Sequence, residues 1–283
     1  MTTDGLVVVD KPAAMTSHDV VSRCRRIFGQ RKVGHAGTLD PDATGVLLVG
    51  LGRATRLLQY MSGLNKAYTT DIVLGTATTT LDDSGEVTGA WDMSGVTLAA
   101  AKASAARLTG TVEQVPPMVS AVKVGGRRLY QLAREGVEVE RAPRTVTVGR
   151  FELEDAGGGV LRARIECSSG TYVRVLAADL GRLLGGGAHV RDLRRTSVGP
   201  WMEADAVPLD QVGPDRVVPP EAMLPWLEAA AVSGEVEAAV RYGRPLSAEE
   251  LGVSGPGPWR IIGSGGDLLA VYEPHRRVVL AGS

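Results

Sequence analysis

The stretch "GHAGTLDPDATGVL", residues 34–47, places two aspartates, Asp40 and Asp42, between a glycine-rich approach and an apolar run. Proline at position 41 disfavours helical backbone angles at Asp40, and the glycines permit tight backbone conformations. Because Asp-Pro commonly begins a turn, local rules alone favour a turn-initiating Asp40, with Asp42 as a cap for segment 43–52. A divalent metal on the two aspartates is least favoured, because hard cations need more oxygen ligands and no other carboxylates gather nearby. We therefore expect no metal site.

The residues before this stretch predict a short buried strand, an amphipathic helix and a loop. The strand covers residues 6–12, and the helix runs from a cap at Thr16 or Ser17 to Gly29. Its apolar stripe consists of Val20, Val21, Cys24, Ile27 and Phe28. Its other face and the residues after it are basic, with Arg23, Arg25, Arg26, Arg31 and Lys32. Such a cluster is usually only a solvated face, but this one leads directly to the loop that carries His35, where an imidazole can stack on a base or hydrogen-bond the backbone.

The rest of the first 200 residues mixes strands and helices without regular alternation. Alternating or apolar runs predict strands at 67–78, 144–155 and 160–170, and the last two form a hairpin. Residues 189–201 are expected to form a strand or an extended loop. Apolar periodicity predicts helices at 97–110 and 171–187. Residues 81–89 have the composition of a polar loop, and residues 118–136 that of a strand, a glycine turn and a short helix. We therefore expect an α+β fold with a mixed, mainly antiparallel sheet.

A proline-rich passage at residues 207–226 separates this region from a small second unit. In the tail, a short helix near residues 235–243 precedes three short strands, at 259–264, 268–273 and 276–281. We expect a large domain over residues 1–222, with an inserted segment at about 95–140, and a small β-rich domain over residues 223–283.

Composition and spacing exclude several classes of protein. The chain of 283 residues has 44% hydrophobic and 22% charged residues, and no apolar run approaches the ~20 residues of a membrane helix. The N-terminus lacks the positive region of a secretory signal, so we expect a cytoplasmic protein. Cys24 and Cys167 lack the spacing of zinc or redox sites and are expected to be buried. The four histidines have no zinc-ligand spacing, and no phosphate-loop or dinucleotide motif is present.

The net charge of -1 conceals strong blocks of charge. Residues 1–70 carry a net charge of +4, from nine Lys/Arg and five Asp/Glu. Residues 71–99 carry -5, from five Asp/Glu and no Lys/Arg, and residues 100–150 carry +5, from nine Lys/Arg and four Asp/Glu. Residues 151–199 carry +1, from seven Lys/Arg and six Asp/Glu, and residues 200–283 carry -6, from six Lys/Arg and twelve Asp/Glu. Two basic blocks are compatible with a phosphate-binding face, although charge alone equally fits a solvated surface.

Five segments, taken in order, resemble the successive motifs of the bacterial tRNA pseudouridine synthase B family. They are "LVVVDKPAAMTSHDVVSRCR", "RKVGHAGTLDPDATGVLLVGLGRATRL", "KAYTTDIVLGTATTTLDDSGEV", "QVPPMVSAVKVGGRRLYQLAREG" and "CSSGTYVRVLAADLG". The resemblance covers about residues 5–200, its GHAGTLDP block is highly specific, and the chain is similar to the actinobacterial version. Val119 departs from the commoner motif, which has an aromatic residue there. The tail resembles a shortened PUA-like RNA-binding domain.

The resemblance implies a pseudouridine synthase fold and isomerisation of the T-loop uridine at tRNA position 55, without a cofactor. It assigns Asp40 as the catalytic aspartate, Tyr68 as the tyrosine that packs on the target base, and Arg174 as the partner of the aspartate. Without it, Tyr68 would be a strand residue half buried in the core, and Arg174 an ordinary surface charge. Whether the aspartate attacks C1′ or removes a sugar proton stays open.

The same resemblance implies how the RNA is held. His35 matches the residue that fills the space left by a flipped base, and Leu193 matches an apolar residue bordering that base, although periodicity alone makes it core. Candidate phosphate contacts, taken from the basic blocks, are Lys11, Arg23, Lys32, Lys123, Arg127 and Arg128. The expected partner is the tRNA T-arm stem-loop, bound by a monomer. An RNA-binding module without catalysis, or a metal-dependent glycosyl transferase using Asp40 and Asp42, are the alternatives.

Overall fold

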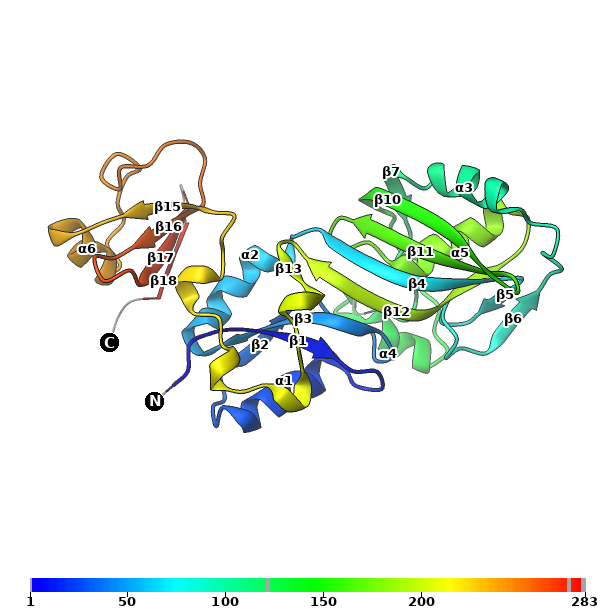
Figure 1. The fold of residues 1–283 in the computed structure, drawn as a ribbon, viewed down its shortest axis with the longest axis horizontal. Coiled ribbons are helices and arrows are strands. Elements are labelled where there is room, and N and C mark those ends of the chain that lie inside the picture. The colour runs from blue at the N-terminus through cyan, green and yellow to red at the C-terminus, as the bar shows by residue number, and fades with distance from the viewer. Residues whose placement is uncertain (1, 121–122, 274–275, 281–283) are drawn as a thin grey trace. The chain divides into compact units, whose positions relative to one another are not determined.

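The structure is a computed structural model that describes residues 2–120, 123–273 and 276–280 (Figure 1). The chain forms two compact units. The first unit consists of Met1–Pro41, Gly45–Gly63 and Val198–Ser283, and the second consists of Asp42–Thr44 and Leu64–Ser197. The quoted stretch 34–47 therefore contributes residues to both units.

The first unit begins with strands packed against one helix. β1 (Gly5–Lys11) pairs antiparallel with β3 (Thr44–Leu51) and parallel with β14 (Val207–Pro208), and β2 (Val33–Ala36) pairs antiparallel with β3. The apolar side of α1 (Ser17–Ile27) joins the core between them. This core contains Val7, Val9, Val20, Val21, Cys24, Val33, Leu47, Val49, Leu51 and Val212. The predicted stripe is confirmed, with Ile27 and Phe28 packed at its edge.

Helix α1 begins and ends where its sequence predicts. The Thr16 side chain accepts from the Asp19 backbone N–H and the Asp19 carboxylate accepts from the Thr16 backbone, which is a complete capping box. Phe28 is the C-cap, and Gly29 follows with φ of 59°, a left-handed angle that glycine adopts without strain.

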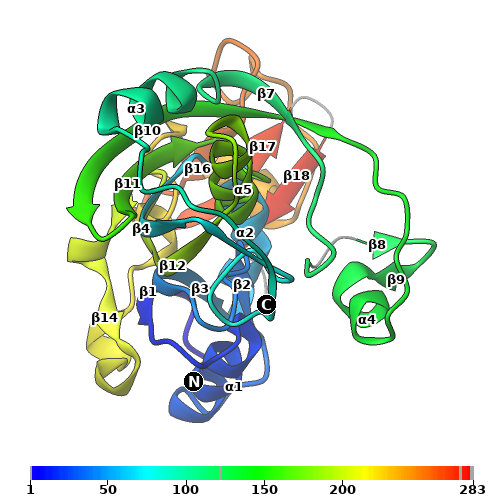
Figure 2. The ribbon, with the colours of Figure 1, turned by 90° about the vertical axis from the view of Figure 1, so that its right-hand side faces the viewer.

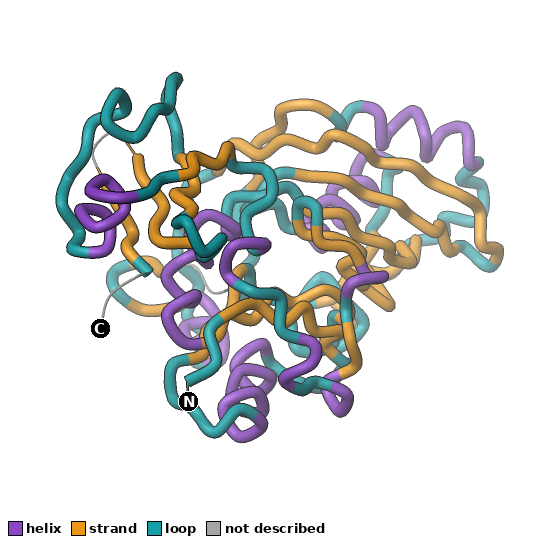
Figure 3. Tube along the Cα trace, turned by 60° about the vertical axis from the view of Figure 1, so that its left-hand side comes forward, coloured by secondary structure: helices purple, strands orange, loops and turns teal. Residues whose placement is uncertain are grey.

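A 3₁₀ turn and a short helix, η1 (Gly52–Leu57) and α2 (Leu58–Ser62), follow β3. Farther along, β13 (Trp201–Met202) precedes the small C-terminal sheet, whose order is β15 (Glu228–Ala231), β16 (Trp259–Ile262), β17 (Leu268–Glu273) and β18 (Arg276–Val279). Figure 3 shows this sheet together with α6 (Gly234–Arg241). The helix and three strands predicted for the tail are confirmed, whereas β15 was not predicted.

The second unit contains five strands of the ten-stranded sheet, in the order β12-β4-β11-β10-β7. These strands are β12 (Ala188–Val198), β4 (Lys66–Leu74), β11 (Val160–Cys167), β10 (Arg144–Gly157) and β7 (Gly110–Gln114). β10 and β11 form the predicted antiparallel hairpin, and β11 alternates buried and exposed residues. Helix α3 (Leu98–Ala106) lies beside β10 and contacts α5 (Val173–Leu183) (Figure 2). The expected α+β fold with a mixed, mainly antiparallel sheet is confirmed.

Smaller elements complete the second unit. β5 (Thr76–Thr78) pairs with β6 (Val87–Ala90), and β8 (Lys123–Val124) pairs with β9 (Arg127–Arg128) ahead of α4 (Leu129–Arg134). The predicted glycine turn and short helix are thus confirmed, while residues 121–122 lie outside the described residues. Cys24 and Cys167 are buried free thiols, as expected, and burial raises the pKa of each to about 11.

Four local predictions were wrong. His35 lies on β2 and not in a loop, because its neighbours bond to β3. Segment 43–52 is largely strand β3 and offers no helix start for Asp42 to cap. The expected loop 81–89 ends in strand β6, and the helix predicted to reach Gly110 stops at Ala106, because residues from Gly110 onward pair with β10 as β7. None of the described helices has the length and apolarity to cross a membrane.

Candidate active site

The loop that carries Asp40 is held by a buried lysine. Lys11, the last residue of β1, is 0% exposed. Its Nζ donates to the carbonyl oxygens of Pro12 at 2.8 Å, Met15 at 2.6 Å and Pro41 at 2.7 Å. Because an ammonium has three N–H bonds, these carbonyls use all of them. Lys11 therefore ties Pro41, the residue after Asp40, to β1 and to the residues ahead of α1.

A serine at the start of α1 fixes the other side of this loop. The Ser17 hydroxyl donates to the carbonyl oxygen of Leu39 at 3.2 Å and accepts from the Leu39 N–H at 2.9 Å. The Met15 N–H also donates to the carbonyl oxygen of Pro41 at 3.3 Å. The residues before and after Asp40 thus both bond to the segment that leads into α1. Asp40 is partly buried and Asp42 is exposed, so the two carboxylates have different environments.

His35 meets a second histidine in the first unit. It is partly buried on β2, opposite Val49 of β3. Its ring lies edge-to-face with that of His18, with centroids 5.5 Å apart and an interplanar angle of 82°. His18 is the second residue of α1 and is exposed.

Tyr68 lies on β4 in the second unit and is buried, with 8% exposure. It pairs with Ile165 of β11. Two residues earlier, the Lys66 ammonium is also buried and donates to the carbonyl oxygen of Leu64 at 2.7 Å. Burial first, and the positive charge of Arg195 second, lower the pKa of Lys66 to about 8. Arg195 on β12 is 0% exposed, so two buried cations accompany the candidate tyrosine.

Arg174 is buried near the start of α5, with 3% exposure. Its guanidinium donates to the carbonyl oxygens of Thr80 at 2.5 Å and Val119 at 2.8 Å, and it forms an ion pair with Asp82 at 3.6 Å. Arg174 is therefore a buried residue and not the surface charge that local sequence rules suggested. Asp82 was not predicted, and its only signal in the sequence was its place in the polar loop beside Asp83.

The start of α5 is itself fixed by a glutamine. The Gln114 side chain accepts from the Tyr172 N–H at 2.9 Å and donates to the Tyr172 carbonyl oxygen at 3.3 Å. Tyr172 is the N-cap of α5, so this pair sets the direction from which Arg174 leaves the helix. The end of β7 therefore positions the first turn of α5.

Leu193 is partly buried on β12. The preceding residue, Asp192, has a φ of 53°, which is uncommon outside glycine and marks a local departure from regular strand geometry. Arg194 follows and donates to the Thr44 hydroxyl at 3.4 Å. Leu193 thus lies between an irregular backbone and an anchored arginine.

The expected phosphate contacts differ in exposure. Arg23 and Lys32 are exposed in the first unit, and Arg127 is exposed in the second, where it pairs with Glu135. Lys11 is buried and fully bonded, so a phosphate contact does not fit it. The side chains of Lys123 and Arg128 lie outside the described part of the structure.

The structure therefore groups the candidate residues by unit. Lys11, His35 and Asp40 lie on β1, β2 and the loop that follows, in the first unit. Tyr68, Arg174 and Leu193 lie on β4, α5 and β12, in the second unit. Within the described ranges, no three His, Cys, Asp or Glu side chains gather as a metal ion requires.

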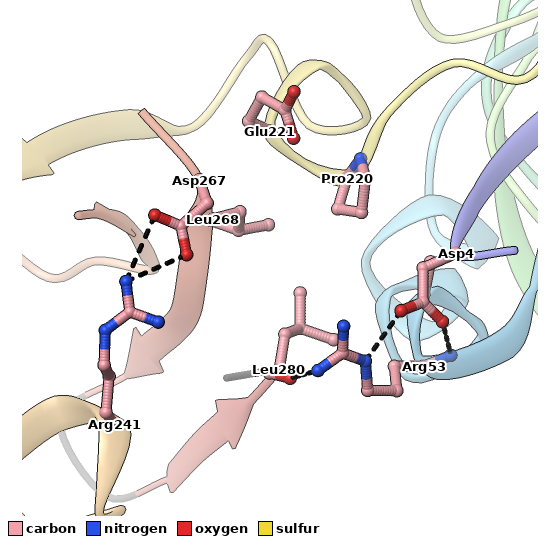
Figure 4. Close-up of a pocket in the computed structure, with 9 residues that line it drawn as sticks. Asp4, Arg53, Pro220, Glu221, Arg241, Asp267, Leu268 and Leu280 are labelled. Carbon is pink, nitrogen blue, oxygen red and sulfur yellow. Dashed lines mark hydrogen bonds and ion pairs between the residues drawn. The ribbon is translucent and has the colours of Figure 1, made fainter. Parts of the chain in front are cut away.

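A separate pocket of about 320 Å³ lies in the first unit and contains none of the candidate residues (Figure 4). Its lining consists of Asp4, Arg53, Ala54, Pro220, Glu221, Arg241, Asp267, Leu268 and Leu280. Arg53 pairs with Asp4 at 2.7 Å, and Arg241 pairs with Asp267 at 3.1 Å. The Asp4 and Asp267 carboxylates neutralise the two arginines of this pocket.

Comparison with known proteins gives the site a context. A family model described as "TruB family pseudouridylate synthase (N terminal domain)" matches residues 25–173, and one described as "tRNA pseudouridylate synthase B C-terminal domain" matches residues 174–217. The chain is 50% identical over 245 residues to a tRNA pseudouridine synthase B of Symbiobacterium thermophilum, covering 85% of this chain and 82% of that protein. It is 45% identical to that of Thermobifida fusca, covering 99% of each.

Two solved structures share the fold over most of the chain. A crystal structure of a Cbf5-Nop10-Gar1 complex has a TM-score of 0.73 at 27% identity, covering 95% of this chain and 78% of that one. A structure of an H/ACA RNP bound to a substrate RNA containing 2′-deoxyuridine has a TM-score of 0.71 at 25% identity, covering 95% and 77%.

Proposed function

Because this chain belongs to the TruB family of pseudouridylate synthases and has their fold, we propose that it converts the T-loop uridine at tRNA position 55 to pseudouridine. The observation that carries the proposal is Asp40, a partly buried carboxylate within the family's GHAGTLDP motif, on a loop fixed from both sides. The exposed Asp42 is proposed to have no part in the chemistry.

The proposed reaction needs one aspartate and no cofactor. Uracil leaves C1′ of the ribose through N1, turns, and rejoins C1′ through C5. C5 then loses its proton and N1 gains one, so the product is an isomer of the substrate. Positive charge develops at the sugar when the bond to N1 breaks, and a carboxylate stabilises or traps such charge in glycosidases. No second carboxylate is required to protonate a departing alcohol, because the leaving base is also the next nucleophile.

Tyr68 and Arg174 are proposed to complete the catalytic set. Tyr68 would pack against the target base and assist removal of the C5 proton. Arg174 would keep the Asp40 carboxylate charged and oriented, since a guanidinium nearby favours the ionised form. The guanidinium of Arg174 is buried and held by Thr80, Val119 and Asp82, which supports a role that requires a cation in a fixed orientation.

Access to the base is proposed to require flipping. Extruding a nucleotide from a folded loop costs a few kcal/mol. The partly buried His35 is proposed to fill the vacated space, where stacking worth about 1–3 kcal/mol per base offsets much of that cost. Leu193 would border the flipped base. Exposed Arg23, Lys32 and Arg127, together with Lys123 and Arg128, are the proposed phosphate contacts.

We further propose residues 1–222 as the catalytic domain and residues 223–283 as a PUA-like domain of a monomeric, cytoplasmic enzyme.

The RNA contacts are testable through the salt dependence of T-arm binding. Replacing Lys123, Arg127 and Arg128 together should weaken T-arm binding and flatten its salt dependence, with a log–log slope smaller by up to about 0.9 for each phosphate that is no longer neutralised. An unchanged slope would move the RNA-binding face elsewhere.

The function is tested by incubating the purified protein with an unmodified T-arm hairpin in EDTA, without nucleotide, and mapping pseudouridine by sequencing. We expect conversion at the position equivalent to 55 and at no other uridine of the hairpin. Tight binding without conversion would instead support a non-catalytic RNA-binding module. Conversion that is lost in EDTA would support a metal-dependent reaction.

A further inference from the structure

The contact between His18 and His35 has no role in the scheme above. His18 lies in the first turn of α1 and His35 lies on β2, seventeen residues later in the sequence. The centroids of their rings are nevertheless only 5.5 Å apart. An angle of 82° is the edge-to-face arrangement that aromatic rings prefer, with the positive edge of one ring on the negative face of the other. The contact therefore restrains the ring of His35.

His18 is well placed to act as a fixed support. The capping box of Thr16 and Asp19 brackets it on the chain, and Ser17, its immediate neighbour, exchanges two hydrogen bonds with Leu39. The backbone of His18 is thereby tied to the same loop that carries Asp40. Its side chain is exposed, so burial in a core does not explain its position.

His35 lies on a short strand and is only partly buried, so the contact with the His18 ring adds to the restraints on its side chain. A side chain that replaces a base in a stack must hold its ring in one orientation, since a freely rotating ring loses conformational entropy when it inserts. A preorganised ring has already lost that entropy in the free protein.

We propose that His18 is a positioning residue that holds the His35 imidazole ready to replace the flipped base; this rests on the function proposed above. It acts before the chemical step and contacts neither C1′ nor the uracil. Loss of the His18 ring therefore slows base flipping and weakens productive binding, while the chemical step, once the base is extruded, keeps its rate. A substitution that keeps an aromatic ring at position 18 keeps the His35 imidazole positioned.

The test uses the full-length protein and a T-arm hairpin with 2-aminopurine beside the target uridine, whose fluorescence reports unstacking. Stopped-flow measurement should show flipping about two- to tenfold slower in His18→Ala, the range that one aromatic contact supports. KM should rise by a similar factor. His18→Phe should restore both towards wild type, and Ser22→Ala, on the same helix, should change neither.

The outcomes separate this inference from the function on which it rests. If the wild-type protein forms no pseudouridine, the proposed function fails. If the wild type is active and His18→Ala flips the base at the wild-type rate with an unchanged KM, the positioning role alone is overturned. Equal defects in His18→Ala and His18→Phe would also overturn it, because the positioning role requires a ring. The ¹⁵N shifts of the His35 imidazole in the free protein should move in His18→Ala and not in Ser22→Ala.

Discussion

At the scale of single residues, buried charges hold the candidate catalytic groups in place. A buried ammonium or guanidinium is costly unless its donors are satisfied. Lys11 meets this requirement with three carbonyls, and Arg174 with two carbonyls and the carboxylate of Asp82. The same bonds that make burial tolerable also fix the loop of Asp40 and the guanidinium of Arg174.

Replacing Lys11 tests the first of these arrangements. Lys11→Met keeps an unbranched side chain that is one atom shorter but leaves the carbonyls of Pro12, Met15 and Pro41 without their donor. We expect the free energy of unfolding to fall by about 2 kcal/mol, since an unsatisfied buried group costs about 1–3 kcal/mol. Pseudouridine formation should slow as well. Urea unfolding measures the first effect, and exposed Lys32→Met, as a control, should leave stability within about 0.5 kcal/mol.

Asp82 offers a test of the second arrangement. Asp82→Asn removes the negative charge beside the buried Arg174 guanidinium but keeps a side chain of similar shape. We expect turnover to fall at least about tenfold, equivalent to about 1.4 kcal/mol in the barrier, with T-arm affinity changed less. The neighbouring exposed residue supplies the control, Asp83→Asn, which should behave as wild type in single-turnover assays. Equal activities for the two variants would contradict the assignment.

Lys66 makes stability depend on pH. Its pKa is about 8 in the folded protein, against 10.5 for an ordinary lysine, because of burial and then of Arg195. Between these values the unfolded chain binds a proton that the folded chain has released, so the free energy of unfolding rises with pH. Below pH 8 the destabilising contribution is constant, and above 10.5 it is gone.

Urea unfolding of wild type and Lys66→Met, from pH 7.5 to 10.5, measures this contribution. The stability of the wild type relative to the variant should rise by roughly 3 kcal/mol across that range, from 1.36 kcal/mol per pKa unit. Exposed Lys102→Met is the matched control and should follow wild type at every pH. Parallel curves for wild type and Lys66→Met would show that burial does not lower this pKa.

At the scale of elements, sequence rules succeeded where local chemistry decides the outcome. Helix α1 carries its own capping box and apolar stripe, and the β10–β11 hairpin carries alternating residues around a glycine turn. They failed where pairing with another strand decides the outcome. β2 forms because β3 pairs with it, and β15 forms because β16 lies alongside, and neither sequence signals its partner.

The segment after β3 shows how such distant contacts join elements. Arg53 and Arg56 in η1 donate to the carbonyl oxygens of Leu280 at 2.9 Å and Val279 at 2.8 Å. The Tyr60 hydroxyl on α2 donates to the Glu273 carboxylate at 2.7 Å. The C-terminal sheet is thus hydrogen-bonded to the segment that directly follows β3.

Removing both arginines tests whether these bonds hold the last strand. The double variant Arg53→Ala/Arg56→Ala loses two hydrogen bonds to carbonyls, worth about 1 kcal/mol each. Amide hydrogen exchange in β18 should accelerate by about thirtyfold, while exchange in β10 and β11 stays unchanged. Arg23→Ala/Arg26→Ala, two exposed arginines of α1, is the control. Exchange in β18 at the wild-type rate would show that other contacts hold it.

At the scale of the whole molecule, the distribution of charge and the sequence motifs support one account. Basic residues concentrate in residues 1–70 and 100–150, whereas residues 200–283 carry -6, so the tail is poorly suited to bind phosphates by charge alone. Family motifs predict Asp40, Tyr68 and Arg174 as site residues, whereas local sequence rules alone would place them in a turn, in the core and on the surface. Asp82, Lys66 and His18 escaped prediction, because their importance depends on burial or on contacts that only the folded chain shows.

We propose that Asp40, and not Asp42, carries out the chemistry. Single-turnover conversion of the T-arm hairpin by wild type, Asp40→Asn and Asp42→Asn, with affinity measured in parallel, tests it most directly. We predict that Asp40→Asn binds the hairpin within about tenfold of wild type, roughly 1.4 kcal/mol, yet forms no pseudouridine. Asp42→Asn should remain active. Pseudouridine formation by Asp40→Asn at a rate near that of wild type would show that Asp40 is not the catalytic carboxylate.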